Sequence, residues 1–160
     1  MKLDRVVQAL VDADVDFIII GGWSAILHGS ARVTNDIDIF FSRKAENLPR
    51  MVAALAPLHP RLRDLPNDLP FVWDEATLRN ATILTLTTDL GSVDLLAEVA
   101  GLGAFEAVRA SALQVEAFGR RVWTLDLESL IQSKRAVGRE KDAAAIRELE
   151  SLREAEEPEG

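Results

Sequence analysis

Two aspartates separated by one apolar residue, Asp36-Ile37-Asp38, are the part of the sequence best suited to chemistry. In a β-strand, residues i and i+2 point to the same face, so the two carboxylates would project side by side. Carboxylates among apolar neighbours are costly to bury unpaired. One interpretation is the exposed polar face of an edge strand. The other is a site for hard cations, such as the paired magnesium ions of phosphoryl transfer.

A third carboxylate, Asp94, lies in a second short apolar stretch, residues 91–96. Alone, it is equally consistent with an ordinary acid near a strand end. If the two strands are neighbours in one sheet, Asp94 converges on Asp36 and Asp38. Three acids that face one point repel one another unless cations lie among them.

Two glycines, Gly21-Gly22, follow the apolar run of residues 17–20 and precede a short helical stretch at residues 24–27. A turn from strand through glycine to helix exposes backbone N–H groups that suit a phosphate. Glycine also allows that backbone to approach the phosphate oxygens closely. The alternative is an ordinary tight turn.

Alternating strands and helices must position these groups, which predicts an α/β (α+β) sheet with helices on one or both faces. We expect a single domain over residues 1–153, with C-terminal helices within 127–152 packing on its core and a frayed acidic tail at 154–160. The expected strands are residues 17–20, 37–41, 82–87, 93–96, 113–118 and 121–125. The expected helices are the first dozen residues and 24–27, 48–55, 105–110, 127–137 and 140–152, with a proline-rich loop at 57–70.

Composition limits the chemistry further. The chain has no cysteine, no tyrosine and two histidines, which excludes disulfides, thiolate zinc sites and cysteine nucleophiles. A metal would therefore be held mainly by oxygen. The formal charge of −8 is poorly suited to general nucleic-acid binding. Because no secretory signal or apolar run long enough to cross a bilayer is found, we expect a cytoplasmic protein without membrane contact.

The combined spacing resembles the signature of the polymerase-β-like nucleotidyltransferase superfamily, in which two glycines close the first strand and an acid–apolar–acid triplet follows on the next. Thirteen residues separate Gly22 from Asp36. The likeness is closer to a small bacterial branch that includes AbiEii-type toxins. Its Gly-Gly-x-x-Ala-x-x-His-Gly and Arg-x-Thr-x-Asp-x-Asp patterns resemble Gly21, Gly22, Ala25, His28, Gly29, Arg32, Thr34, Asp36 and Asp38. Residues 133–142 resemble the closing Ser-Lys and Arg-x-Lys-Asp elements of that branch.

The resemblance implies a nucleotidyltransferase-like mixed β-sheet flanked by helices, and transfer of a nucleoside monophosphate from an NTP to a hydroxyl. It implies two Mg²⁺ ions, with Mn²⁺ as a substitute, held by Asp36, Asp38 and Asp94. Asp94 is also the implied base.

The same resemblance implies which residues meet the triphosphate: the backbone at Gly21 and Gly22, the Ser24 hydroxyl and Lys134. Lys134 is also explained as part of a charged helix surface. Arg32 either touches phosphate or pairs with the site acids, and both interpretations stay open. The remaining residues of interest, each with a structural explanation of equal or greater weight, are Trp23, His28, Trp123 and Asp142.

The acceptor implied by the resemblance is tRNA or protein, in a toxin–antitoxin-like system with a cognate antitoxin as partner. A small-molecule antibiotic is the alternative acceptor, because Gly21-Gly22-Trp23 matches short antibiotic-modifying nucleotidyltransferases. A third possibility, from a different class, is a non-catalytic nucleotide-binding antitoxin or regulatory module.

Overall fold

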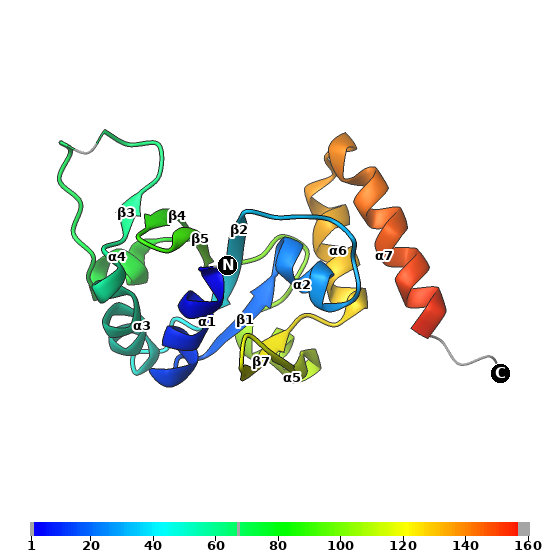
Figure 1. Cartoon of the computed structure of the whole chain (residues 1–160), viewed down its shortest axis with the longest axis horizontal. Helices are drawn as coiled ribbons and strands as arrows, with labels where there is room; N and C mark the ends of the chain where they lie inside the picture. Colours follow the sequence, from blue (N-terminus) through cyan, green and yellow to red (C-terminus); the bar gives the residue numbers. More distant parts are fainter. Residues whose placement is uncertain (1, 67, 157–160) are drawn as a thin grey trace.

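The computed structural model describes residues 2–66 and 68–156. In this part of the chain, strands form one mixed seven-stranded sheet in the order β3-β4-β5-β2-β1-β7-β6, flanked by helices (Figure 1). This confirms the predicted fold class. The strands are β1 (Phe17–Ile20), β2 (Asp36–Phe41), β3 (Arg61–Leu62), β4 (Ile83–Thr88), β5 (Gly91–Leu96), β6 (Leu113–Ala117) and β7 (Arg120–Thr124).

Apart from the short helix Glu75–Asn80, the helices agree with the apolar periodicity of the sequence, with ends shifted by a few residues. They are α1 (Leu3–Asp12), α2 (Gly21–Leu27), α3 (Asn47–Leu55), α4 (Glu75–Asn80), α5 (Phe105–Ser111), α6 (Leu127–Val137) and α7 (Ala143–Glu156), with 3₁₀ turns η1 (Ala56–Leu58) and η2 (Glu140–Asp142). Each helix of the described ranges is too short or too polar to traverse a bilayer.

The side chains of strand β2 alternate between the two faces of the sheet. Its apolar residues Ile37 and Ile39 are fully buried in a core that also contains apolar residues of α1 and α3. Its acids, Asp36 and Asp38, alternate with them and therefore point to the other face. A second core on that face joins Phe40 to apolar residues of α6 and α7. The acids thus lie on the same face of the sheet as α6.

The proline-rich segment contains structure that the sequence did not indicate. Its two-residue strand β3 pairs antiparallel with β4, with Arg61 opposite Thr87. Helix α4 follows, and the Asp74 carboxylate caps it by accepting from the Thr77 backbone N–H at 2.9 Å. A two-residue strand is too short to show an alternating pattern, so periodicity could not reveal it.

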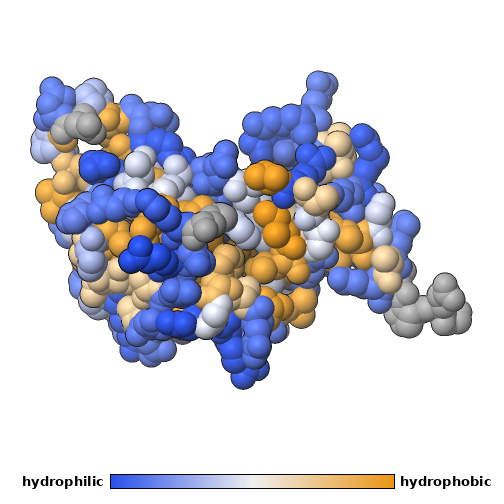
Figure 2. All heavy atoms as spheres, in the orientation of Figure 1, coloured by the Kyte–Doolittle hydropathy of each residue, from blue (hydrophilic) through white to orange (hydrophobic). Residues whose placement is uncertain are grey.

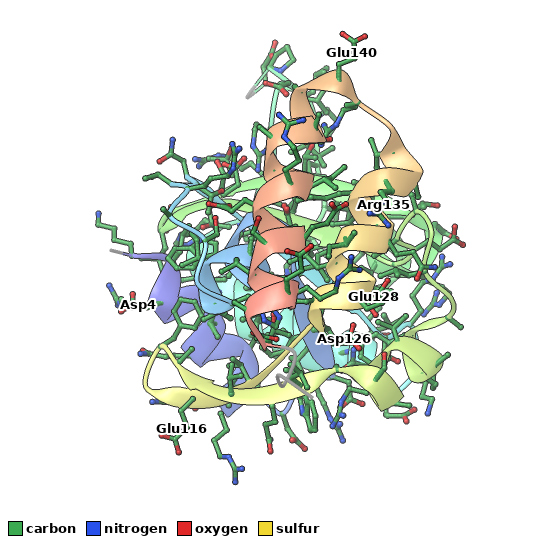
Figure 3. All side chains as sticks on the ribbon, turned by 90° about the vertical axis from the view of Figure 1, so that its right-hand side faces the viewer. Asp4, Glu116, Asp126, Glu128, Arg135 and Glu140 are labelled. Carbon is green, nitrogen blue, oxygen red and sulfur yellow. The ribbon has the colours of Figure 1, made fainter. Side chains whose placement is uncertain are left out.

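The two C-terminal helices lie side by side at one end of the sheet, and charged side chains link them (Figure 3). Arg135 of α6 pairs with Glu150 of α7, and Arg153 Nη1 lies 2.8 Å from Glu128 Oε2. The last helix continues to Glu156, so residues 154–156 of the expected tail are helical. Residues 157–160 lie outside the described residues.

Candidate active site

Strand register brings the three main features of the sequence together. Asp38 of β2 is aligned with Asp94 of the parallel strand β5 on one side and with Ile20 of β1 on the other. Because Gly21 follows Ile20 directly, the glycine turn begins beside Asp38. Asp36 lies two residues earlier on β2, opposite Ser92. The acids and the glycine turn therefore share one end of neighbouring strands.

The Asp38 carboxyl is crowded by like charge. Burial, repulsion by Asp94 and a hydrogen bond between these two carboxyl groups raise the pKa of Asp38 to about 7. Repulsion by Asp36 adds to this effect, and the positive charge of Lys134 opposes it. Lys134 of α6 therefore lies close enough to act electrostatically on Asp38, although the two residues are far apart in the sequence.

Both glycines lie close to neighbouring side chains, and the approach is tighter at Gly21. Gly21 has φ of +64°, and a Cβ atom there would lie 2.1 Å from Asp38 Oδ2. A Cβ atom on Gly22 would lie 3.1 Å from Thr34 Cβ. The backbone at the start of α2 therefore runs against the acids and against the loop that leads into β2.

A small cavity of about 180 Å³ adjoins this turn. Its walls include Gly22 and Thr34, Lys134 of α6, and Arg32 of the loop before β2. The two predicted cationic phosphate contacts, Arg32 and Lys134, thus line the same cavity as Gly22. In Figure 2 the surface is hollowed between the β3–α4 lobe and the α6–α7 lobe, above the start of β2.

The Arg32 guanidinium pairs with Glu148 of α7, at 3.6 Å between Nε and Oε1, rather than with the site acids. Glu148 also accepts from Ser30 Oγ at 2.6 Å and from the Ala31 backbone N–H at 3.4 Å. The hydrogen bond from Ser30 is the main reason that the pKa of Glu148 is lowered. Sequence analysis did not single out Glu148, which holds the loop before β2.

Ser24 lies differently from the sequence expectation. Its side chain is fully buried, and its hydroxyl shares a 2.7 Å hydrogen bond with the Thr124 hydroxyl of β7. The Thr124 hydroxyl in turn donates to the Ile19 carbonyl. Position 24 faces the sheet, because α2 packs on β1 and β2 and the Ser24 hydroxyl meets Thr124 of β7. This hydroxyl is therefore directed into the protein and not toward a phosphate in the cavity.

The other residues singled out in the sequence make structural contacts. His28 Nε2 lies 2.6 Å from the Leu125 carbonyl oxygen, and Trp23 packs edge-to-face on Phe118 with ring centroids 5.3 Å apart. The Arg109 guanidinium lies 3.1 Å from the centre of the Trp123 ring. Asp142 Oδ2 accepts from Arg139 Nε at 2.7 Å. Neither tryptophan lines the small cavity.

Arg63, at the end of β3, was also missed. Its Nη2 donates to Asp94 Oδ1 at 2.7 Å and to the Leu86 carbonyl at 2.8 Å. No pattern in the proline-rich segment distinguished this arginine, because its contact with Asp94 depends on the pairing of three strands. One oxygen of the predicted base is therefore already engaged.

The oxygen donors of the three acids decide whether a divalent cation fits this site. Among the described side chains, no three or more of His, Cys, Asp and Glu already form a metal-ligand cluster. The carboxylates of Asp36, Asp38 and Asp94 nevertheless supply the hard oxygen donors that Mg²⁺ prefers. The repulsion that raises the pKa of Asp38 is also what a cation would relieve. The residues present therefore fit a magnesium site.

A larger cavity lies elsewhere. It has a volume of about 870 Å³ and is lined by residues that follow β2 and β5, among them Arg43 and Glu98. Since Asp38 and Asp94 lie within these strands and the cavity lies beyond their opposite ends, it does not include the acids. We place the candidate site at the three acids and the Gly21–Gly22 turn. The smaller cavity adjoins it through Gly22 and Lys134, although the acids themselves do not line that cavity.

Comparisons with known proteins show the family of the chain and the proteins that share its fold. The profile of a family described as "Nucleotidyltransferase of unknown function (DUF6036)" matches residues 1–155. No curated protein sequence matches the chain. Among solved structures, the fold is similar to the lincosamide antibiotic adenylyltransferase LnuA in its lincomycin-bound form, with a TM-score of 0.62, 16% identity, and coverage of 94% of this chain and 96% of that one.

Two further solved structures share the fold. A putative nucleotidyltransferase from Thermotoga maritima has a TM-score of 0.57 and 18% identity, over 92% of this chain and 91% of that chain. The antibiotic-resistance factor ANT(2'')-Ia has a TM-score of 0.56 and 16% identity, over 96% of this chain and 88% of that chain. At these identities the likeness concerns the fold alone.

Proposed function

The chain belongs to the DUF6036 family of nucleotidyltransferases, and we propose that it moves a nucleoside monophosphate from an NTP to a hydroxyl acceptor in a metal-dependent reaction. The observation that carries this proposal is the alignment of Asp38 with Asp94 beside the Gly21 turn. Paired carboxylates can hold divalent ions, and the adjacent glycine backbone can approach phosphate oxygens. Both features suit phosphoryl transfer to a hydroxyl.

Asp36, Asp38 and Asp94 would hold the divalent ions, with Mg²⁺ as the expected metal and Mn²⁺ as a substitute. When bound, such ions neutralise the charge of the transferring phosphate and of the departing pyrophosphate. Asp94 would accept the proton of the acceptor hydroxyl. The acceptor oxygen then bonds to the α-phosphorus as the bond to the bridging oxygen breaks, and pyrophosphate leaves.

The triphosphate would lie along the small cavity. The backbone at Gly21 and Gly22 would approach its oxygens, and Lys134 and Arg32 would supply positive charge. We leave the Ser24 hydroxyl out of this set, because it would first have to break its buried hydrogen bond with Thr124.

The first acceptor class that we propose is a hydroxyl of tRNA or protein, in a toxin–antitoxin-like system of the cytoplasm with a cognate antitoxin. The support is the resemblance of the segment from Gly21 to Asp38, with His28 and Thr34 within it, to the AbiEii-type pattern.

The second candidate is a small-molecule antibiotic. The observation in its favour is the extent of the likeness to LnuA, which covers 94% of this chain and 96% of that chain and so includes the C-terminal helices. Both candidates use the same acids, so the reaction class does not depend on the choice.

The test is incubation with each α-labelled NTP and Mg²⁺ in the presence of total tRNA, cell protein, a lincosamide or an aminoglycoside. We expect label to pass to one of these acceptors and the Asp36→Asn variant to abolish transfer. The exposed Glu116 on edge strand β6 provides a control, Glu116→Gln, that should keep wild-type transfer. Nucleotide binding without transfer to any acceptor would instead support the non-catalytic regulatory module.

A further inference from the structure

A backbone hydrogen bond fixes the position of Arg63 next to strand β4. Its N–H donates to the Thr85 carbonyl at 2.9 Å, which extends the pairing of β3 with β4 by one residue. Thr85 is in turn aligned with Asp94 across β4 and β5. The short strand β3 therefore delivers Arg63 to the same level of the sheet as Asp94.

The side chain then makes two contacts through one nitrogen. Nη2 donates to Asp94 Oδ1 at 2.7 Å and to the Leu86 carbonyl at 2.8 Å. The two charged side chains are 25% and 21% exposed, so this pair is more shielded from water than ordinary surface ion pairs. Arg63 Nε is buried without an acceptor in the described ranges, so the guanidinium is held in place by its Nη2 contacts.

We propose that Arg63 is a positioning residue for the transfer reaction: it holds Oδ1 of Asp94 and so directs the second carboxylate oxygen toward Asp38 and the cation that these acids would share. This inference rests on the proposed function. Partners that hydrogen-bond a ligating carboxylate fix its orientation, and their removal commonly weakens metal binding by about 10–100-fold.

The contact with Asp38 supports this assignment. Asp94 is aligned with Asp38 on the neighbouring strand, and the repulsion between their carboxyl groups helps to raise the pKa of Asp38. With Oδ1 bound to Arg63, Asp94 cannot rotate to place both oxygens toward solvent without breaking the ion pair. A carboxylate with one oxygen fixed presents the other in a defined direction, as a metal ligand or a proton acceptor must.

The test compares the variants Arg63→Met and Arg61→Met. Arg61 is an exposed arginine two residues earlier, within strand β3, so it serves as the matched control. The primary readout is binding of Mn²⁺ alone, followed by its electron paramagnetic resonance signal. We expect Arg63→Met to weaken Mn²⁺ binding by about 10–100-fold and Arg61→Met to change it by less than about two-fold.

Two further measurements separate positioning from a purely structural role. In an Asp94→Asn background, Arg63→Met should weaken Mn²⁺ binding no further, because the two residues act as one unit. In turnover, Arg63→Met should lower kcat by about 10–100-fold with little change in the KM for NTP, and Arg63→Lys should restore part of the loss. Should the methionine variant fail to fold, Arg63→Gln gives the same Mn²⁺ comparison.

Wild-type or tighter Mn²⁺ binding by a folded Arg63→Met protein would overturn the inference, tighter binding meaning that Arg63 competes with the cation. In that case label transfer by the wild-type protein leaves the proposed function intact. If the wild-type protein binds no Mn²⁺ and transfers no label, the proposed function fails, and the inference fails with it.

Discussion

The carboxyl groups of Asp38 and Asp94 belong to residues aligned with each other on the parallel strands β2 and β5. Burial, together with repulsion by the nearby Asp94 carboxyl group, raises the pKa of Asp38 to about 7. Without a counter-charge for both carboxylates, this arrangement costs stability once Asp38 is ionised, and a bound cation would offset that cost.

The first prediction concerns this cost. Because the pKa of Asp38 is raised in the folded state, its contribution to stability is fully present below its unfolded pKa, near about 4, and is lost as the pH rises through about 7. Without metal, Asp38→Asn should therefore increase the free energy of unfolding relative to wild type at about pH 8, by at most a few kcal/mol. Urea denaturation from about pH 5 to about pH 8 in a chelating buffer measures this difference.

Asp12→Asn is the control of opposite sign. A hydrogen bond from Arg120 lowers the pKa of Asp12, so its ionised form stabilises the fold, and replacing it should not stabilise the protein at any pH. An Asp38→Asn variant that is no more stable than wild type at about pH 8 would contradict the prediction that ionised Asp38 destabilises the fold.

The second prediction concerns the glycine turn. Gly21→Ala forces a residue with a Cβ atom into a left-handed conformation and against Asp38 Oδ2. We expect a loss of about 1–2 kcal/mol in stability from the backbone conformation and a loss of transfer activity because Asp38 is displaced. Gly103→Ala is the control, since a Cβ there meets its nearest atom at 3.8 Å. Equal activities of the two alanine variants would show that the approach of Gly21 to Asp38 is not needed.

The third prediction concerns Lys134. Replacing it with methionine removes the positive charge that lines the small cavity and opposes the upward shift in the pKa of Asp38. We expect the KM for NTP to rise by about ten-fold or more, the loss expected for one charge-assisted hydrogen bond of about 1.5–3 kcal/mol. Lys141→Met replaces an exposed lysine seven residues further along the chain and should leave the KM unchanged. A KM that responds equally to both lysines would point to general electrostatic attraction.

The fourth prediction concerns the loop before β2. Glu148→Gln removes the charge that pairs with Arg32 and weakens the hydrogen bonds from Ser30 and Ala31. We expect faster hydrogen exchange across residues 28–35 and a higher KM for NTP, with little change in the melting temperature. Glu150→Gln is the matched control two residues along the same helix, where the partner is Arg135. Unchanged exchange in the Glu148 variant would show that α7 does not hold this loop.

Much of the fold was accessible from the sequence because long apolar patterns carry it. The continuous run of β1 and the alternation in β2 predicted a buried strand and a strand with an acidic face, and the structure has both. The strand β3 and helix α4 were missed because each is short and depends on its neighbours for stability.

The candidate site divides in the same way. Gly21, Asp36 and Asp38 could be named as candidates because they stand close together within short motifs, and the family resemblance added Asp94. Arg63 and Glu148 could not, because each acts on a residue far away in the chain, at 2.7 Å from Asp94 and 2.6 Å from Ser30. Ser24 was expected to contact phosphate because it follows the two glycines. Its side chain is instead buried, because packing of α2 on the sheet decides which side of the helix it occupies.

The parallel pairing of β2 with β5 has a consequence for preparing the protein. Side chains alternate between faces, so a shift of β5 by a single position would carry Asp94 to the side of α1 and α3 while the strands remained paired. Such misfolded molecules would keep nearly all of the native circular dichroism but would lack a complete centre. Activity per milligram is therefore best normalised by titrating bound ligand rather than by total protein concentration.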